Sequence, residues 1–394
     1  TKSINTFSIE TETKTIKADP QDTQNVPDSK DETVQYSSHA VVWVRQAEYS
    51  TTYRVTLDGI TSTHTTPDSS QSGVSTSDIA ESLASSIDGL SGVSASANGS
   101  VIHITTSGQP KLGVNDSIGN SGMEGFVANV GSEDELPGNG LPDGYKVKVR
   151  GETQDTNGYW LRFTTDVDYT NGVWEETVAP GHKVEFRAET MPLSLTRRQD
   201  LSRTDTDNTY GIYFKLEPTS WARRLVGDEE SVPLPPFAAL DEDDDTRTNG
   251  TITSMAMHKS RLVFVSRDNI VVSEVNDFFN FFRSSAAVSV ASDPFSVTVD
   301  SNRPLNIHHM SSMAGGLMLW DRYDQYLLTS GTTFSPSELN SQKVMSKGMD
   351  VSIPPVSVGS TYMFLVNRGR YYGVSEIYAQ EDVNLFQTRD LSEQ

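Results

Sequence analysis

Cysteine is absent from this chain of 394 residues. Without thiols there is neither a disulfide framework nor a thiolate metal site, so cohesion depends on packing, hydrogen bonds and subunit contacts. Long apolar runs are also missing, and none approaches the roughly 20 residues that cross a bilayer as a helix. No charged start is followed by an apolar segment. The sequence therefore predicts neither a signal peptide nor stable insertion of this segment into a membrane.

Basic residues are scarce. Lys and Arg number 31 against 53 Asp and Glu, which gives a formal net charge of −22. Proteins that grip nucleic acid by its phosphates need clustered basic side chains, so this balance argues against tight DNA binding. It is compatible with a surface that DNA passes without sticking, because like charges repel over a Debye length of about 8 Å. Solubility alone explains an acidic surface equally well.

The first residues carry little apolar periodicity. Residues 1–38 are polar and charged, which predicts an extended arm or linker. The chain starts at Thr1 rather than methionine. We therefore interpret the chain as an interior piece of a longer protein. Residues 39–190 are expected to form a separate α+β module with strands at 40–44, 53–57 and 101–105.

One helix is predicted between the second and third of these strands. Ile79, Leu83 and Ile87 recur every four residues, which is typical of an amphipathic helix. Ser77 is expected to cap its first turn and Gly89 to end it. Residues 109–144, rich in glycine, asparagine and proline, are expected to form a long irregular loop. Alternation at 145–149 and 159–163, followed by residues 173–178, predicts a three-stranded meander with one buried face.

Residues 191–394 show almost no helix signals. Short strands are predicted throughout this part, and their spacing is typical of a β-sandwich or a propeller, between which composition does not choose. The predicted strands cover residues 212–216, 254–258, 261–266, 270–273, 295–299, 316–320, 325–329 and 362–367.

The densest acidic run of the sequence consists of Asp241, Glu242, Asp243, Asp244 and Asp245. Its alternate acids have the spacing that opens a calcium loop. However, Thr246 stands where the tight-turn glycine belongs and Ile252 where a closing glutamate belongs. Asp166 and Asp168 fail the same test. We therefore predict no metal site, and interpret the run as an acidic loop that faces a channel or solvent.

Two further pairs invite a chemical role. His308 and His309 are adjacent, so on a strand their rings point to opposite faces and do not easily share one metal. Glu175 and Glu176 beside Trp174 suggest a glycosidase, but only one of them can face a given cleft and the sequence supplies no second carboxylate. No nucleophile elbow or phosphate-binding loop is present. We predict no catalytic residue and no cofactor.

Four phenylalanines, at Phe278, Phe279, Phe281 and Phe282, close the segment from Met255 to Phe282. Together they would bury about 600–1,000 Å², too much to leave exposed to water on a monomer. We expect core packing, with a subunit contact as the alternative.

The order of three motifs along the chain carries a resemblance. The Met255–Phe282 segment, the residues 188–192 upstream and Leu319-Trp320-Asp321 downstream resemble the tail tubular protein B family of short-tailed phages, or podoviruses, which form the nozzle of the tail. The resemblance extends from about Tyr53 to Asp382. It implies a propeller-like body at 191–394, preceded by an insertion-like α+β domain at 39–190 that includes the fibre dock.

The resemblance also implies a function. The protein would be a structural virion protein, assembled in the host cytoplasm as a homo-hexamer that guides DNA during ejection. Its partners would be an adaptor ring similar to tail tubular protein A, tail fibres and transiently passing DNA. The rival hypotheses are a carbohydrate-active tail depolymerase and a receptor-binding adhesin.

Overall fold

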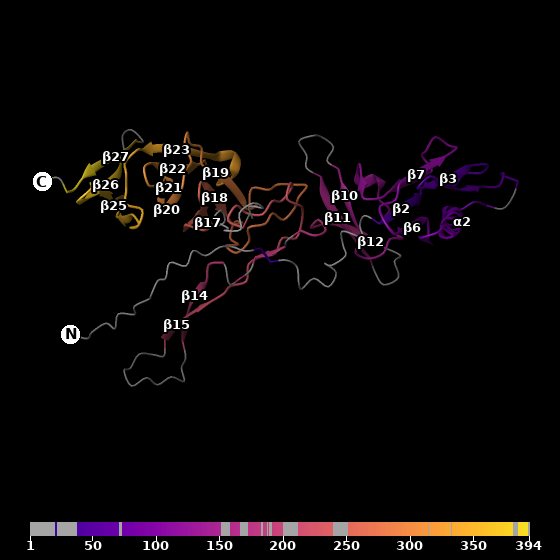
Figure 1. Cartoon of the computed structure of the whole chain (residues 1–394), viewed down its shortest axis with the longest axis horizontal. Coiled ribbons are helices and arrows are strands. Elements are labelled where there is room, and N and C mark those ends of the chain that lie inside the picture. The colour runs from indigo at the N-terminus through magenta and orange to yellow at the C-terminus, as the bar shows by residue number, and fades with distance from the viewer. Residues whose placement is uncertain are drawn as a thin grey trace.

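A computed structural model shows an elongated molecule made of separate β-sheets strung along its length (Figure 1). The fold is mainly β, as predicted, and α2 is the one α-helix within the described part of the chain. The structure describes residues 20–21, 38–70, 73–150, 158–165, 172–182, 184–186, 188, 191–199, 212–238, 251–313, 315–331, 333–380 and 385–392.

Two sheets and the helix form one end of the molecule (Figure 1). One sheet has the order β5-β6-β2-β8 and the other β4-β3-β7. The elements are β2 (His39–Val44), β3 (Thr52–Leu57), β4 (Ile60–Thr65), α2 (Thr76–Asp88), β5 (Val93–Asn98), β6 (Val101–Thr106), β7 (Leu112–Asp116) and β8 (Met123–Phe126).

The helix is predicted correctly, but its cap is not. Ser75 rather than Ser77 caps α2, because its hydroxyl accepts a hydrogen bond from the Asp78 amide at 3.1 Å while its own backbone is extended. Gly89 ends the helix as expected. Ile79, Leu83 and Ile87 are buried against apolar residues of β2, β3 and β6.

Strand β2 is buried on both faces. Ala40, Val42 and Val44 belong to the core under α2. Val41 points to the opposite face, where it joins a second core with the next sheet. A continuous apolar run is what a strand covered on both sides requires.

The predicted meander forms this next sheet, whose order is β12-β11-β10-β9. The buried face expected from the alternation is confirmed, since Val147, Leu161 and Phe163 lie in the second core. Residues 109–144 are not one irregular loop, because β7, β8 and β9 lie within them. The elements are β9 (Asn129–Val130), the 3₁₀ turn η1 (Glu133–Glu135), β10 (Lys146–Val149), β11 (Tyr159–Thr165) and β12 (Gly172–Thr177).

Two small two-stranded ribbons are separate from the larger sheets. β1 pairs with β13, and β14 pairs antiparallel with β15. Of the predicted arm, β1 and Ser38 are described and the remaining residues lie outside the described part. The strands are β1 (Pro20–Gln21), β13 (Glu185–Phe186), β14 (Ser194–Gln199) and β15 (Ile212–Glu217).

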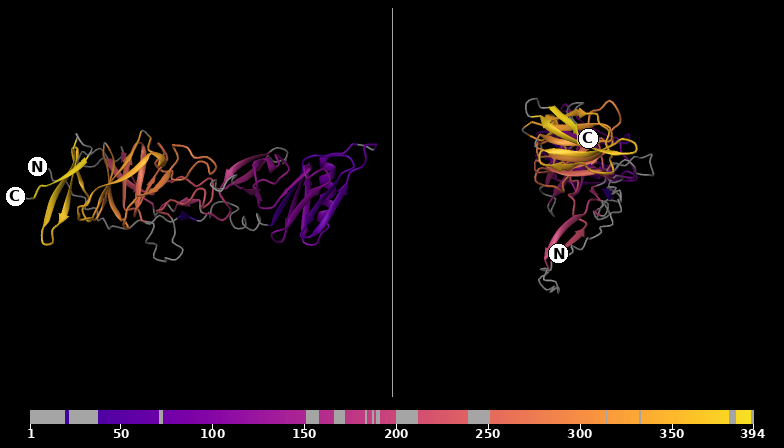
Figure 2. Two further views of the ribbon diagram at one scale, coloured as in Figure 1. Left: turned by 90° about the horizontal axis from the view of Figure 1, so that it is seen from above. Right: turned by 90° about the vertical axis from the view of Figure 1, so that its left-hand side faces the viewer.

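Three four-stranded antiparallel sheets follow in chain order, each with its strands paired sequentially. Figure 2 shows them along one half of the molecule. Their elements are β16 (Ser254–His258), β17 (Arg261–Ser266), β18 (Asn269–Val272) and β19 (Phe295–Thr298), then β20 (Ile307–Met313), β21 (Gly316–Asp321), β22 (Gln325–Ser330), η2 (Pro336–Glu338) and β23 (Leu339–Met345), and finally β24 (Val356–Val358), β25 (Thr361–Asn367), β26 (Tyr372–Gln380) and β27 (Leu385–Asp390).

The three sheets, which we call the body, share cores with one another. Val263 and Ile270 of the first sheet pack with Leu317 and Leu328 of the second. Trp320 and Met318 on the other face of the second sheet pack with residues of the third. The eight predicted strands of this part all exist, whereas β14, β20, β23, β24, β26 and β27 were not predicted. A closed propeller ring is not among the described sheets.

Candidate functional sites

A polar joint connects the meander sheet to the body. At the end of β12, Val178 forms a parallel bridge with Gly227. The Gly227 amide donates to the Thr177 carbonyl at 2.9 Å, and its carbonyl accepts from Ala179 at 3.0 Å. Gly227 has a φ of +84°, and a Cβ there would lie 2.6 Å from Val232. This backbone conformation and close approach therefore require glycine.

Asp228 is the centre of the joint. It is buried, and its carboxylate accepts from Lys148 Nζ at 2.9 Å and Trp160 Nε1 at 3.2 Å, both on the meander sheet. The amide and hydroxyl of Ser231 donate to its other oxygen, each at 2.9 Å. Burial by itself would raise the pKa of Asp228. The hydrogen bonds from Ser231 and Lys148 outweigh burial and hold that pKa well below its usual range.

Glu176 makes the second contact across the joint. Its two carboxylate oxygens accept from the Ser285 hydroxyl and the Ala286 amide, each at 2.6 Å. Ser285 and Ala286 follow the phenylalanine segment of the body. One carboxylate thus holds a loop that is 109 residues away in sequence. Its neighbour Glu175 is exposed and is 3.3 Å from Thr164 Oγ1.

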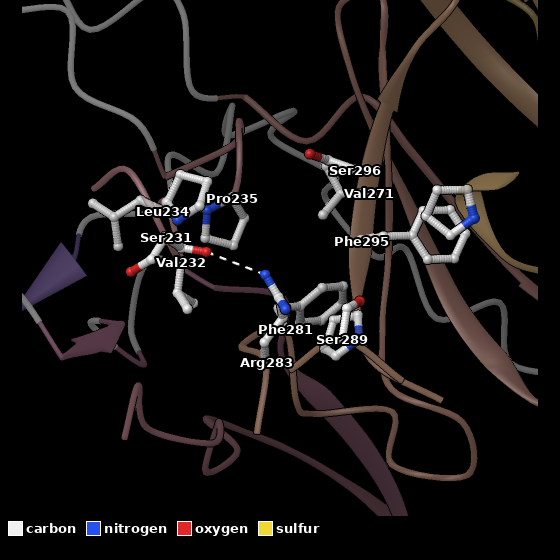
Figure 3. A pocket seen from close by; sticks show the side chains of 13 residues that line it. Ser231, Val232, Leu234, Pro235, Val271, Phe281, Arg283, Ser289, Phe295 and Ser296 are labelled. Atoms are coloured by element: carbon white, nitrogen blue, oxygen red, sulfur yellow. Dashed lines mark hydrogen bonds between the residues drawn. The ribbon is translucent and has the colours of Figure 1, made fainter. Parts of the chain in front are cut away.

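A cavity of about 250 Å³ lies beside the joint. Arg283 at its wall donates to the Ser231 carbonyl at 3.2 Å, as Figure 3 shows. The other lining residues are apolar or small, and among the described residues that line it there is no carboxylate. The cavity therefore lacks the paired acids that glycoside hydrolysis needs.

The phenylalanine cluster divides between interior and surface. Phe281 stacks on Phe264 with ring centroids 4.9 Å apart, and Phe282 stacks on Phe186 at the same distance. Both are buried. Phe279 is 40% exposed and lies edge-on to Trp221. Phe278 is half-buried. A subunit contact by the exposed members stays a prediction.

The other candidate residues have separate surroundings. His309 Nε2 lies 2.8 Å from the Val351 carbonyl oxygen. Burial and the neighbouring His309 lower the pKa of His308. Within the described ranges no three His, Asp or Glu side chains gather as a metal site would require. The run Asp241–Asp245 and the residues Asp166 and Asp168 lie outside the described part.

The joint itself was not predicted. Glu176 was singled out for a different chemistry, and Lys148 and Asp228 gave no signal. The residues that these side chains bond across the joint are 68 or more positions away in sequence, and a single sequence does not report such contacts. Gly227 followed by an aspartate was the one local hint, since it marks a turn.

A family model described as "Bacteriophage nozzle protein" matches residues 3–394. The chain belongs to the bacteriophage nozzle protein family. This confirms the resemblance to phage nozzle proteins and makes the chain a structural component of a phage tail.

One relative matches part of this nozzle family chain. The tail tubular protein gp12 of Escherichia phage T7 is 28% identical over 255 residues, which are 64% of this chain and 28% of that protein. The chain thus spans less than a third of that relative's length. Among solved structures, a putative 6-phosphogluconolactonase from Bacteroides uniformis aligns at 11% identity with a TM-score of 0.25, covering 69% of this chain and 78% of that one. Similarity at that level does not establish a shared fold.

In the described residues, no helix is long and apolar enough to span a membrane.

Proposed function

We propose that this chain forms part of the wall of a tail nozzle, a ring-shaped channel through which DNA leaves the particle. The observation that carries the proposal is the family match over residues 3–394. In the proposed assembly six copies form the tube, an adaptor ring lies above it, and the subunits assemble in the host cytoplasm before they join the virion. The excess of 53 acidic over 31 basic residues supports a channel to which DNA does not adhere.

Residues 191–394, which include the body, would be part of a propeller. Three consecutive four-stranded antiparallel sheets that share cores with their neighbours support this proposal. A propeller repeats four-stranded sheets around a centre, and each buries its faces against the next. The sheets that would close the ring belong to the longer protein in this proposal.

The α+β module, together with the adaptor, would hold the tail fibres. It has cores of its own and extends from one end of the body (Figure 2). The joint supports this role, because an anchor must transmit force to the tube. Charge-assisted hydrogen bonds that are buried, as at Asp228, or half-buried, as at Glu176, resist separation better than exposed ion pairs.

The rival function as a depolymerase has less support. Glu176 is occupied by Ser285 and Ala286, and the cavity beside the joint lacks acids among its described lining. We expect no sugar release from polysaccharide or murein. Release that persists on repetition and disappears in a Glu175→Gln or Glu176→Gln variant would contradict this expectation.

The fibre-docking proposal is tested by deletion. Phe186 packs in the body core, so the deletion should cover residues 39–178, replaced by a Gly/Ser bridge, within the full-length protein. We expect assembled tails without fibres in electron micrographs. Normally fibred tails would show that the anchor lies elsewhere, and absent tubes would show that the module belongs to the wall. An intact protein with the same bridge inserted after residue 70 is the control.

A further inference from the structure

The β14–β15 ribbon stands apart from the rest of the molecule. It is a two-stranded sheet that pairs with no other described strand, and it leads away from the body in Figure 1 and in the right-hand view of Figure 2. Isolated two-stranded ribbons are at best marginally stable in water. A ribbon of this kind gains stability when another surface covers one of its faces.

The two faces of the ribbon differ in chemistry. Leu195 pairs with Leu216, and Arg197 pairs with Phe214, so these four side chains share one face. Leu195, Phe214 and Leu216 are 65%, 63% and 61% exposed, and none of the apolar clusters among the described residues includes them. This apolar face is larger than the single exposed apolar residues that are normal on a surface.

The opposite face is polar. Lys215 and Arg198 both form ion pairs with Glu217 there. Arg197, in contrast, pairs with no described carboxylate and lies among the apolar side chains. The surface that covers the apolar face must therefore be apolar at its centre and supply negative charge for Arg197.

We propose that the apolar face of the β14–β15 ribbon binds a second copy of this chain. A chain with 53 acidic and 31 basic residues presents the negative charge that Arg197 requires. If the ribbon binds a different region of the neighbour, the contact is heterologous, and repetition of such contacts forms a ring when the rotation between neighbours closes. This inference rests on the proposed function, because it assigns one contact between the subunits of the tube.

Nucleic acid and membrane fit the ribbon less well. DNA contacts basic side chains through phosphates, but two of the three cations already pair with Glu217 and the leucines would stay wet. A bilayer would leave the free backbone edges of an open ribbon without hydrogen-bond partners. Anionic lipids would also repel a chain with a net charge of −22.

Photo-crosslinking tests the inference in the full-length protein. A benzophenone amino acid replaces either Phe214 or Tyr213, which are adjacent and point to opposite faces. We expect a ladder of crosslinked copies from position 214 and a several-fold lower yield from position 213. Mass spectrometry should join the probe to a peptide of the same protein. Equal yields at both positions, or crosslinks from position 214 to another tail protein, to DNA or to lipid alone, would overturn the inference.

A second measurement separates this inference from the proposed function. The full-length protein and its Leu195→Asp variant are compared by electron microscopy and mass photometry, with Thr196→Asp on the polar face as the matched control. We expect rings from the parent and the control and mostly smaller species from Leu195→Asp. Rings that form without a ladder from position 214 contradict only the inference. A crosslinked ladder without rings contradicts the proposed tube.

Discussion

Phe281 lies between aromatic rings of the body and is buried, whereas Phe279, two positions earlier, is 40% exposed. Truncation of a buried phenylalanine removes packing and leaves a cavity, so Phe281→Ala should lower the free energy of unfolding by about 3–5 kcal/mol. Phe279→Ala should lower it by about 1 kcal/mol or less. Chemical denaturation of the two variants measures the difference, and equal losses would mean that the exposed ring carries as much packing as the buried one.

The histidine pair His39 and His103 makes the stability of the module depend on pH. Their ring nitrogens lie 2.8 Å apart between β2 and β6. Burial, reinforced by the neighbouring His39, lowers the pKa of His103 from 6.5 to about 4. The unfolded chain therefore binds more protons than the folded chain between these values. Stability contributed by the neutral ring is complete above about pH 6.5 and is lost as the pH falls toward 4.

Replacement of His103 by glutamine removes this titration. Across that window we expect the parent chain to lose up to about 1.4 kcal/mol per pH unit more than the variant. Urea denaturation at several pH values measures the difference. Parallel curves for the two proteins would mean that the pair does not titrate with folding.

At the scale of single residues, the sequence predicts which side chains are buried better than it predicts which side chains hydrogen-bond to each other. The buried alternation of Val147, Leu161 and Phe163 is visible because period two is local. The role of Glu176 is not visible in the sequence, because its carboxylate accepts hydrogen bonds from two donors in a loop of the body. The sequence pattern of a glutamate near Trp174 is the same whether the glutamate binds a sugar or hydrogen-bonds to a loop.

Among the elements, the helix α2 offers a sharp test of capping. Ser75→Ala removes the acceptor for the Asp78 amide and should cost about 1 kcal/mol of stability. Ser77→Ala leaves that bond intact and should change stability by less than about 0.5 kcal/mol. Thermal unfolding followed by circular dichroism measures both. A larger loss in Ser77→Ala would restore the cap predicted from the sequence.

The strands that were not predicted have weak local sequence signals, and the physical reason differs from strand to strand. β20 contains a register shift between Ile307 and His309, which breaks the alternation. β23 is polar in the middle, because one of its faces is exposed. β7 and β8 lie among glycines, and Gly125 is needed where Val114 packs closely against its backbone. Local propensity is weak in such segments, and pairing with neighbours decides their conformation.

For the whole molecule, we expect the joint to determine whether the module and the body move as one. Glu176→Gln with Lys148→Met keeps the side-chain sizes but removes one acceptor and one cation from the joint. We expect unchanged secondary structure and a larger radius of gyration in small-angle X-ray scattering, since the two parts reorient more freely. The matched control is Glu175→Gln with Arg150→Met, two exposed positions. A variant whose scattering equals that of the control would show that apolar contacts hold the joint.

The elongated shape gives the joint a mechanical meaning. The module lies at one end of the molecule and the last sheet of the body at the other (Figure 2). A small rotation at the joint therefore becomes a large displacement at the tip of the module, as at the end of a lever. A sideways pull on the module produces its greatest bending moment where the module meets the body. Asp228 and Glu176 lie at that position, and their charge-assisted hydrogen bonds oppose the torque.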